Sequence, residues 1–82
     1  MKTREIILQR KDGLSSQLAC FFIQKANQFS SEILMEYHEK KVNAKSLLGV
    51  LSLCVPPRAV IRLHADGPDE EEAIDALEEF LK

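Results

Sequence analysis

Residues 58 to 81 read RAVIRLHADGPDEEEAIDALEEFL, and this stretch decides the kind of fold. Over residues 58 to 65 apolar and polar side chains alternate, which is the period of a strand with one buried face. The Asp-Gly-Pro sequence at 66 to 68 predicts a turn, because these residue types favour tight backbone bends. From residue 69 onward apolar side chains recur at spacings of three and four, which predicts a helix.

The start of this last helix carries further signals. Asp69 is a residue type that caps helices, and Glu72 stands three positions later, as in a capping box. The acidic residues at 70 to 72 also complement the positive end of the helix dipole. We therefore predict that Asp69 caps this helix. Its buried stripe is expected to consist of Ala73, Ile74, Leu77, Phe80 and Leu81.

The same two periods recur toward the N-terminus. Alternation predicts strands over residues 2 to 9 and 32 to 37, and a short connection leads from the second of them into a hairpin strand at 40 to 43. Helical spacing predicts a helix over residues 16 to 29. An apolar segment predicts a short helix over residues 47 to 53, before two prolines stop it.

The resulting order, β-α-β-β-α-β-α, places the chain in the α+β class. Because strands with one polar face pair antiparallel and leave that face to water, we expect a four-stranded antiparallel sheet with three helices packed on one side. Residues 1 to 82 leave room for only one core, so a single domain is expected.

Composition excludes several classes of function. With 11 basic and 13 acidic residues the formal net charge is -2, which gives no overall field to attract nucleic acid or an anionic membrane. No apolar run approaches the roughly 20 residues of a membrane span, and the first residues lack a signal-peptide pattern. No Walker loop, zinc-ligand spacing or hydrolase motif occurs. We therefore expect no enzyme activity, no metal and no cofactor.

Cysteine and histidine offer no evident site. Cys20 and Cys54 lie in apolar stretches, so we expect two buried, unpaired thiols, which favours a reducing cytoplasm. His38 lies among charged residues, and His64 alternates with Arg62 on the polar face of a strand. Neither has a carboxylate at a useful spacing, so both are expected to be exposed imidazoles without a function.

Two hydroxyl groups stand where helices are expected to begin. Ser15 or Ser16 precedes the first helix and Ser46 precedes the second, and serine is a favoured N-cap. Unpaired backbone N–H groups and the helix dipole favour an anion at such a position. A phosphate on Ser46, beside Lys45, would add about -1.5 to -2 charges without melting the helix. The alternative is a cap with no further role.

Three segments carry a resemblance to a known family. They are KKVNAKSLLG at residues 40 to 49, ADGPDEEEAI at residues 65 to 74, and Gly13-Leu14 leading into Ala19 and Phe22. Together they resemble the histidine-containing phosphocarrier (HPr) family of the bacterial sugar phosphotransferase system, over essentially the whole chain. The resemblance implies an open-faced β-sandwich of four antiparallel strands with three helices on one side, in agreement with the element order.

The resemblance breaks at the residues of phosphate transfer. The family motif Gly-Leu-His-Ala-Arg-Pro-Ala is represented by GLSSQLA, so Ser15 replaces the phospho-accepting His, Gln17 the supporting Arg and Leu18 the Pro. A serine hydroxyl is a weak nucleophile without an adjacent base, and its phosphoester is too stable to pass the group on. Glutamine lacks the guanidinium fork that holds phosphoryl oxygens. We therefore predict that the protein does not relay phosphate from phosphoenolpyruvate to sugar permeases.

Ser46, in contrast, matches the regulatory site of the family in low-GC Gram-positive bacteria. There an ATP-dependent HPr kinase/phosphorylase modifies the serine, and the product acts as co-repressor for a catabolite-control transcription factor. The chain resembles the Crh-like branch, which lacks the acceptor His and keeps this serine. The resemblance implies phosphorylation at Ser46 with Lys45 as its electrostatic neighbour, and a partner-docking face made of Leu47, Leu48 and Leu51.

Other interpretations stay open. A phosphate-free interaction module would bind a protein through the open sheet face or through residues 47 to 51. An unorthodox carrier would use another residue. The flexible stretch at residues 9 to 15 could also act as a hinge, so that two chains exchange the first strand and form a strand-swapped homodimer, as in Crh-like proteins.

Overall fold

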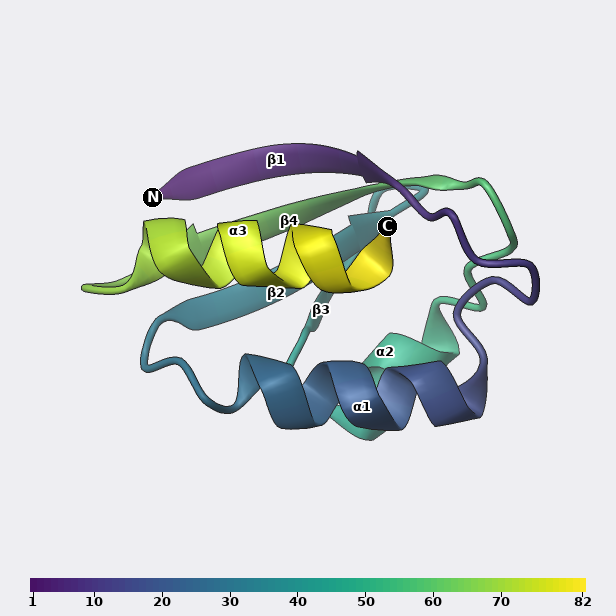
Figure 1. The fold of residues 1–82 in the computed structure, drawn as a ribbon, viewed down its shortest axis with the longest axis horizontal. Coiled ribbons are helices and arrows are strands. Elements are labelled where there is room, and N and C mark those ends of the chain that lie inside the picture. Colours follow the sequence, from purple (N-terminus) through teal and green to yellow (C-terminus); the bar gives the residue numbers. More distant parts are fainter.

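The computed structural model describes residues 1–82 and contains one four-stranded antiparallel sheet (Figure 1). Its strands are β1 Lys2–Ile7, β2 Glu32–Tyr37, β3 Lys40–Asn43 and β4 Val60–Asp66. They lie in the order β1-β4-β2-β3, so the last strand of the chain sits between the first two. All three neighbouring pairs run antiparallel. The α+β fold predicted from the two periods is confirmed.

Three helices cover one face of the sheet. They are α1 Ser16–Ala26, α2 Leu47–Ser52 and α3 Glu70–Leu81. In Figure 1, α3 runs along β1 and β4, and α1 lies next to α2. The opposite face of the sheet carries no helix. None of the three helices combines the length and the hydropathy that crossing a membrane requires.

Besides α2, which ends at Ser52, one residue before its predicted end, two elements end two or more residues before the positions that their periodicity predicts. Strand β1 ends at Ile7, and two residues later the Gln9 N–H donates to the carbonyl of Leu81 in α3, 3.4 Å away, rather than to β4. Helix α1 stops before Asn27, whose backbone N–H and side-chain Nδ2 both donate to the Ile23 carbonyl at 2.9 Å. The two loops that follow are therefore longer than the periodicity predicts.

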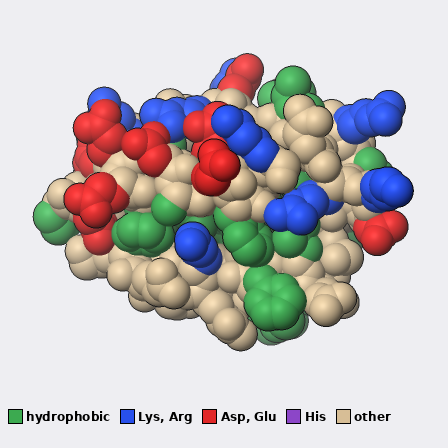
Figure 2. All heavy atoms as spheres, viewed as in Figure 1, with side chains coloured by type: hydrophobic (Ala, Val, Ile, Leu, Met, Phe, Trp, Pro, Cys, Tyr) green, Lys and Arg blue, Asp and Glu red, His purple; other side chains and the backbone are tan.

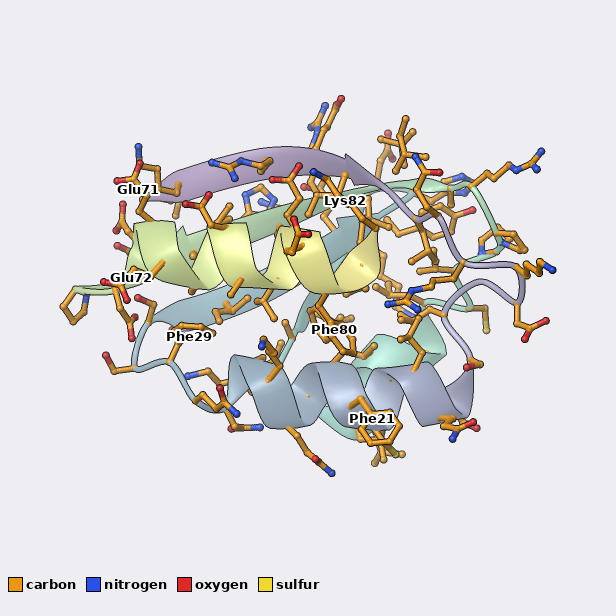
Figure 3. The ribbon with its side chains drawn as sticks, in the orientation of Figure 1. Phe21, Phe29, Glu71, Glu72, Phe80 and Lys82 are labelled. Carbon is orange, nitrogen blue, oxygen red and sulfur yellow. The ribbon has the colours of Figure 1, made fainter.

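Apolar side chains of both layers form one core of 19 buried residues, in which Phe22 is the largest. The ring of Phe22 lies 6.4 Å from that of Phe80, which points from α3 toward α1 (Figure 3). The predicted stripe of α3 is confirmed except that Phe80 is only half-buried. The buried members of that stripe and of β4 are Ala73, Ile74, Leu77, Leu81, Ile61, Leu63 and Ala65.

The prediction that the Asp69 side chain caps α3 is wrong. Asp69 stands at the N-cap, but its side chain makes no capping hydrogen bond. Its carboxylate instead accepts from the backbone N–H groups of Ser30 and Ser31 at 2.9 Å and from the Ser31 hydroxyl. These hydrogen bonds, that of the Ser31 hydroxyl first, lower the pKa of Asp69 to about 2. Glu70 rather than Glu72 reaches back, accepting from the Gly67 N–H at 3.1 Å.

The connection between β2 and β3 is a tight two-residue turn, as predicted. His38 and Glu39 have φ values of 50° and 66°, in the left-handed region that glycine and asparagine adopt more readily. The imidazole of His38 is exposed and stacks on the ring of Tyr37, with centroids 4.1 Å apart. The pairing of β2 with β3 therefore holds His38 and Glu39 in a turn conformation that these residue types disfavour.

Both thiols are exposed and unpaired, so their predicted burial is wrong. Cys20 follows buried Ala19 on α1 and lies on the solvent side of the helix. Cys54 lies between buried Leu53 and Val55 and has a φ of 50°. An apolar stretch thus contains outward-facing positions, and the argument from buried thiols to a reducing compartment loses its basis.

Candidate functional site

Ser15 stands at the beginning of α1 as its N-cap. Its backbone is extended, and its Oγ accepts a hydrogen bond from the Leu18 N–H at 3.2 Å. The loop before it is held by the Leu14 N–H, which donates to the Val55 carbonyl at 2.9 Å. Gly13 has a φ of 66°, and a Cβ there would lie 2.5 Å from the Val55 carbonyl oxygen. Ser15 rather than Ser16 is therefore the cap, on a closely packed loop.

An open hollow of about 310 Å³ lies beside Ser15. Ser15 has no hydrogen bond to an imidazole or a carboxylate, so no base activates its hydroxyl. Gln17 is exposed, and Phe21 projects from α1 into solvent (Figure 3). The residues that line the hollow are Arg10, Lys11, Asp12, Gly13, Ser15, Gln17, Leu18 and Phe21. Its two cationic residues, Arg10 and Lys11, come from the loop after β1, where no sequence motif points to them.

Ser46 is the N-cap of α2, as predicted. Its Oγ accepts from the Gly49 N–H at 3.2 Å, and its own N–H donates to the Asn43 carbonyl at 3.0 Å. The side chain is half-buried. The first turn of α2 contains no acidic residue, so its unpaired N–H groups face no competing negative charge from the helix itself.

Lys45 is fixed between two helices. Its Nζ donates to the carbonyl of Phe29, just beyond the end of α1, at 2.6 Å. Its backbone N–H donates to Oδ1 of Asn43 at 2.9 Å. In this structure the Lys45 ammonium is therefore bound to the loop after α1, while remaining adjacent to Ser46 along the chain.

The predicted docking leucines differ in their exposure. Leu48 is 82% exposed and Leu47 is 38% exposed. Leu51 is half-buried and packs against the core, on the same helix as fully buried Val50. Leu47 and Leu48 thus present an apolar surface directly after Ser46, whereas part of Leu51 holds α2 in place.

The open face of the sheet carries a polar network that the sequence did not reveal. Nε2 of His64 lies 2.8 Å from Oε1 of Glu36, and its Nδ1 lies 2.9 Å from Oγ1 of Thr3. The hydrogen bond with His64 is the main cause of a lowered pKa of Glu36. The expectation that His64 is an exposed imidazole with no carboxylate beside it is therefore wrong, because its side chain is 13% exposed and contacts Glu36. Its partners come from other strands, so only the strand register could have indicated them.

These groups do not form one site. His64 and its partners lie on the open sheet face, whereas Ser15 and Ser46 begin two helices on the other side. The helices α1 and α2 pack against each other. No group of three or more His, Cys, Asp or Glu side chains is arranged to hold a metal ion.

Comparison with known proteins identifies the family. A family model described as "PTS HPr component phosphorylation site" matches residues 2–82. The chain is 42% identical to the HPr-like protein Crh of Halalkalibacterium halodurans over 82 residues, covering 100% of this chain and 98% of that protein.

Two solved structures extend this comparison. HPr-C-His from Thermoanaerobacter tengcongensis has a TM-score of 0.95 at 47% identity, covering 99% of this chain and 91% of that one. A Bacillus subtilis Crh crystal structure, a dimer with a swapped domain, has a TM-score of 0.79 at 38% identity, covering 99% of this chain and 93% of that one. HPr and Crh proteins are phosphocarrier or regulatory proteins, not enzymes. The chain therefore belongs to the HPr family, as a Crh-like regulatory member.

Proposed function

We propose that the protein is a regulator of carbon catabolite control that is switched by phosphorylation of Ser46. The observation that carries this proposal is the position of Ser46 at the start of α2, directly before exposed Leu47 and Leu48. An HPr kinase/phosphorylase would modify the hydroxyl. A catabolite-control transcription factor would then bind the phosphate together with the apolar surface beside it.

The electrostatics of α2 support a phosphate at this position. Phosphorylation adds about -1.5 to -2 charges at pH 7 and strong acceptor oxygens. The Gly49 N–H already points at the Ser46 oxygen, and no carboxylate of the first turn opposes the new charge. Lys45 is the cation next along the chain. A phosphate is therefore expected to keep α2 folded and to change what its surface attracts.

Carrier function is not part of the proposal, because the Ser15 side chain caps α1 and has no base beside it. Its oxygen accepts from the Leu18 N–H, and no imidazole or carboxylate is hydrogen-bonded to it. A phosphoserine there would be a stable ester rather than a donor. Gln17 provides no guanidinium fork for the phosphoryl oxygens.

A phosphate-free interaction module is the second candidate. The exposure of Leu47 and Leu48 favours it, because an apolar surface can bind a partner without a charge beside it. The two candidates differ in one respect: only the first requires a modified Ser46 for binding.

We also propose that two copies can exchange β1 and form a homodimer. The Crh relative from Bacillus subtilis is a dimer with a swapped domain. In this chain β1 pairs with β4 along its whole length, and the loop that follows it includes exposed residues 9 to 12. A strand at the edge of the sheet followed by such a loop can leave and be replaced by its copy.

Incubation with ATP and an HPr kinase, followed by intact-mass spectrometry, tests the main proposal. One added phosphate is expected, and it should disappear in Ser46→Ala but persist in Ser15→Ala. Binding of the phosphorylated form to a catabolite-control transcription factor should then exceed that of the unmodified form. Absence of modification under conditions that label an ordinary HPr would favour the phosphate-free module. Labelling from phosphoenolpyruvate by enzyme I would instead indicate a carrier.

A further inference from the structure

Positive charge gathers at the end of the molecule opposite the start of α3. A hollow of about 520 Å³ is lined there by Gln9, Arg10, Lys11, Pro57 and Arg58, and we call it the basic hollow. Acidic residues fill the first turn of α3 at the other end. Figure 2 shows Asp and Glu crowded at the left with Lys and Arg among them, and mainly Lys and Arg at the right beside an acidic group. The net charge of -2 is therefore not spread evenly over the molecule.

The cations of the basic hollow form no ion pair within the chain, although Asp12 follows Lys11 directly in the sequence. No ion pair involves Arg10, Lys11 or Arg58, whereas Lys2, Arg4 and Arg62 all have carboxylate partners. Arg10 is held in place by Phe80, whose carbonyl accepts from Nη2 at 2.5 Å and whose ring lies 5.7 Å below the guanidinium. These partners carry no formal charge, so Arg10 keeps its attraction for an anion.

Backbone hydrogen bonds hold the two loops of the basic hollow together. The Arg58 N–H donates to the Leu8 carbonyl and the Leu8 N–H donates to the Ala59 carbonyl, both at 2.9 Å. The Gly13 N–H donates to the Arg10 carbonyl at 3.2 Å. Arg58 has a φ of 63°, a left-handed conformation for which a non-glycine residue is an uncommon choice. The cations thus stand on a fixed scaffold.

The arrangement of the cations on two loops indicates which kind of anion fits the basic hollow. A compact phosphate is usually held by backbone N–H groups. Of the residues that line the basic hollow, Gln9 and Arg58 have paired N–H groups, Pro57 has none, and the N–H groups of Arg10 and Lys11 donate to no carbonyl of the chain. The three long cationic side chains come from two loops over one open hollow, and this spread suits several carboxylates along a chain better than a single compact group.

We propose that the basic hollow binds an acidic segment of a partner protein. Arg10, Lys11 and Arg58 face its carboxylates, and complementary charge steers the encounter and fixes the orientation of the partner. The hollow lies apart from α2, so this contact requires no phosphate on Ser46. It gives the chain a second point of attachment beside the surface of Leu47 and Leu48.

Titration of the full, unphosphorylated chain with a fluorescein-labelled oligoglutamate peptide tests this proposal. Fluorescence anisotropy should report binding that weakens as salt is added, and none to a Gly-Ser peptide of equal length. The double substitution Lys11→Gln/Arg58→Gln should weaken binding about five- to tenfold, given two lost ion pairs. The exchange Lys11→Arg/Arg58→Lys keeps both charges and should retain binding.

A matched control separates local from overall charge. Lys40→Gln/Lys41→Gln makes the same change in net charge on β3 and should leave peptide affinity nearly unchanged. Equal weakening in both double variants would overturn the proposal. So would displacement of the peptide by inorganic phosphate at the peptide's own concentration, or tighter binding of phosphatidylserine vesicles or single-stranded DNA than of the peptide.

Discussion

The carboxylate of Asp69, at the start of α3, accepts hydrogen bonds from the backbone N–H and the hydroxyl of Ser31, a residue only 1% exposed. This contact fastens the loop before β2 to the helix that covers β1 and β4. A Cβ on Gly67 would lie 2.6 Å from the Ser31 hydroxyl oxygen, so the turn before α3 packs directly on the same contact. Stability of the two-layer fold should therefore depend on the ionisation of Asp69.

Acid should remove this contribution. The pKa of Asp69 is about 2 in the folded chain against an ordinary 3.8, so the unfolded chain binds the proton more readily. The stabilisation is then fully present above pH 3.8 and is lost as the pH falls toward 2. Asp69→Asn should lower the melting temperature at neutral pH, and its difference from the natural chain should shrink toward pH 2. Circular dichroism melts measure both.

Glu72→Gln is the matched control for that experiment. It removes one negative charge from the same helical turn, but Glu72 is exposed and does not take part in the hydrogen bonds to Ser31. Glu72→Gln is therefore expected to lower the melting temperature less than Asp69→Asn does. Equal losses in the two variants would contradict the role of the Ser31 contact.

The two capping serines should contribute similarly to stability and differently to modification. Ser15→Ala and Ser46→Ala each remove an oxygen that accepts from a first-turn N–H, so each should cost about 0.5–2 kcal/mol in urea denaturation. Thr substitutions keep the cap and should recover most of that loss. A Ser46→Ala chain as stable as the natural one would show that the hydrogen bond to Gly49 does not cap α2.

The β2–β3 turn should be improved by glycine. Glu39 has a φ of 66°, a conformation that costs a non-glycine residue about 1–2 kcal/mol. Glu39→Gly should therefore raise the free energy of unfolding by up to about 1 kcal/mol. Lys40→Gly, one residue further and inside β3, should lower it instead. Equal effects of the two substitutions would argue against strain in the turn.

Carrier activity should require more than a returned imidazole. Ser15→His alone lacks the guanidinium that would hold the phosphoryl oxygens, so labelling from phosphoenolpyruvate by enzyme I should stay weak. The triple change Ser15→His/Gln17→Arg/Leu18→Pro should be labelled far more strongly. The acid lability and alkali stability of the label identify an N–P bond. Strong labelling of the single variant would show that Gln17 is no obstacle.

Arg10 should restrain the proposed strand exchange. Its side chain ties the loop after β1 to Phe80 in α3, a contact that the opening of this loop would break. Arg10→Gln should therefore raise the dimer fraction several-fold in size-exclusion chromatography with light scattering. Lys11→Gln removes a charge from the same loop without that contact, and it should leave the fraction unchanged.

The two layers of the fold could be predicted because the spacing of apolar residues within each strand and helix determines which face is buried. Ile61 and Leu63 point into the core since every second residue of a strand shares a face. Ile74 and Leu77 do so because they lie one helical turn apart. The caps at Ser15 and Ser46 are equally local, each involving an N–H three residues away.

The remaining features depend on neighbours that are distant in the sequence. His64 lies 28 residues from Glu36 and 61 from Thr3, so its network appears only once the strand register is known. The Asp69 carboxylate accepts hydrogen bonds from Ser31, 38 residues away, and none from the N–H groups of its own helix. The basic hollow likewise joins residues 9 to 11 to residues 57 and 58, which no periodicity connects.

The outward-facing Cys20 and Cys54 affect how assembly can be studied. Air oxidation could join two such molecules covalently through a surface sulfur, and the product would have the mass of a strand-exchanged pair. Preparations kept under reductant, or Ser substitutions at both positions, distinguish a strand-exchanged dimer from a disulfide-linked one.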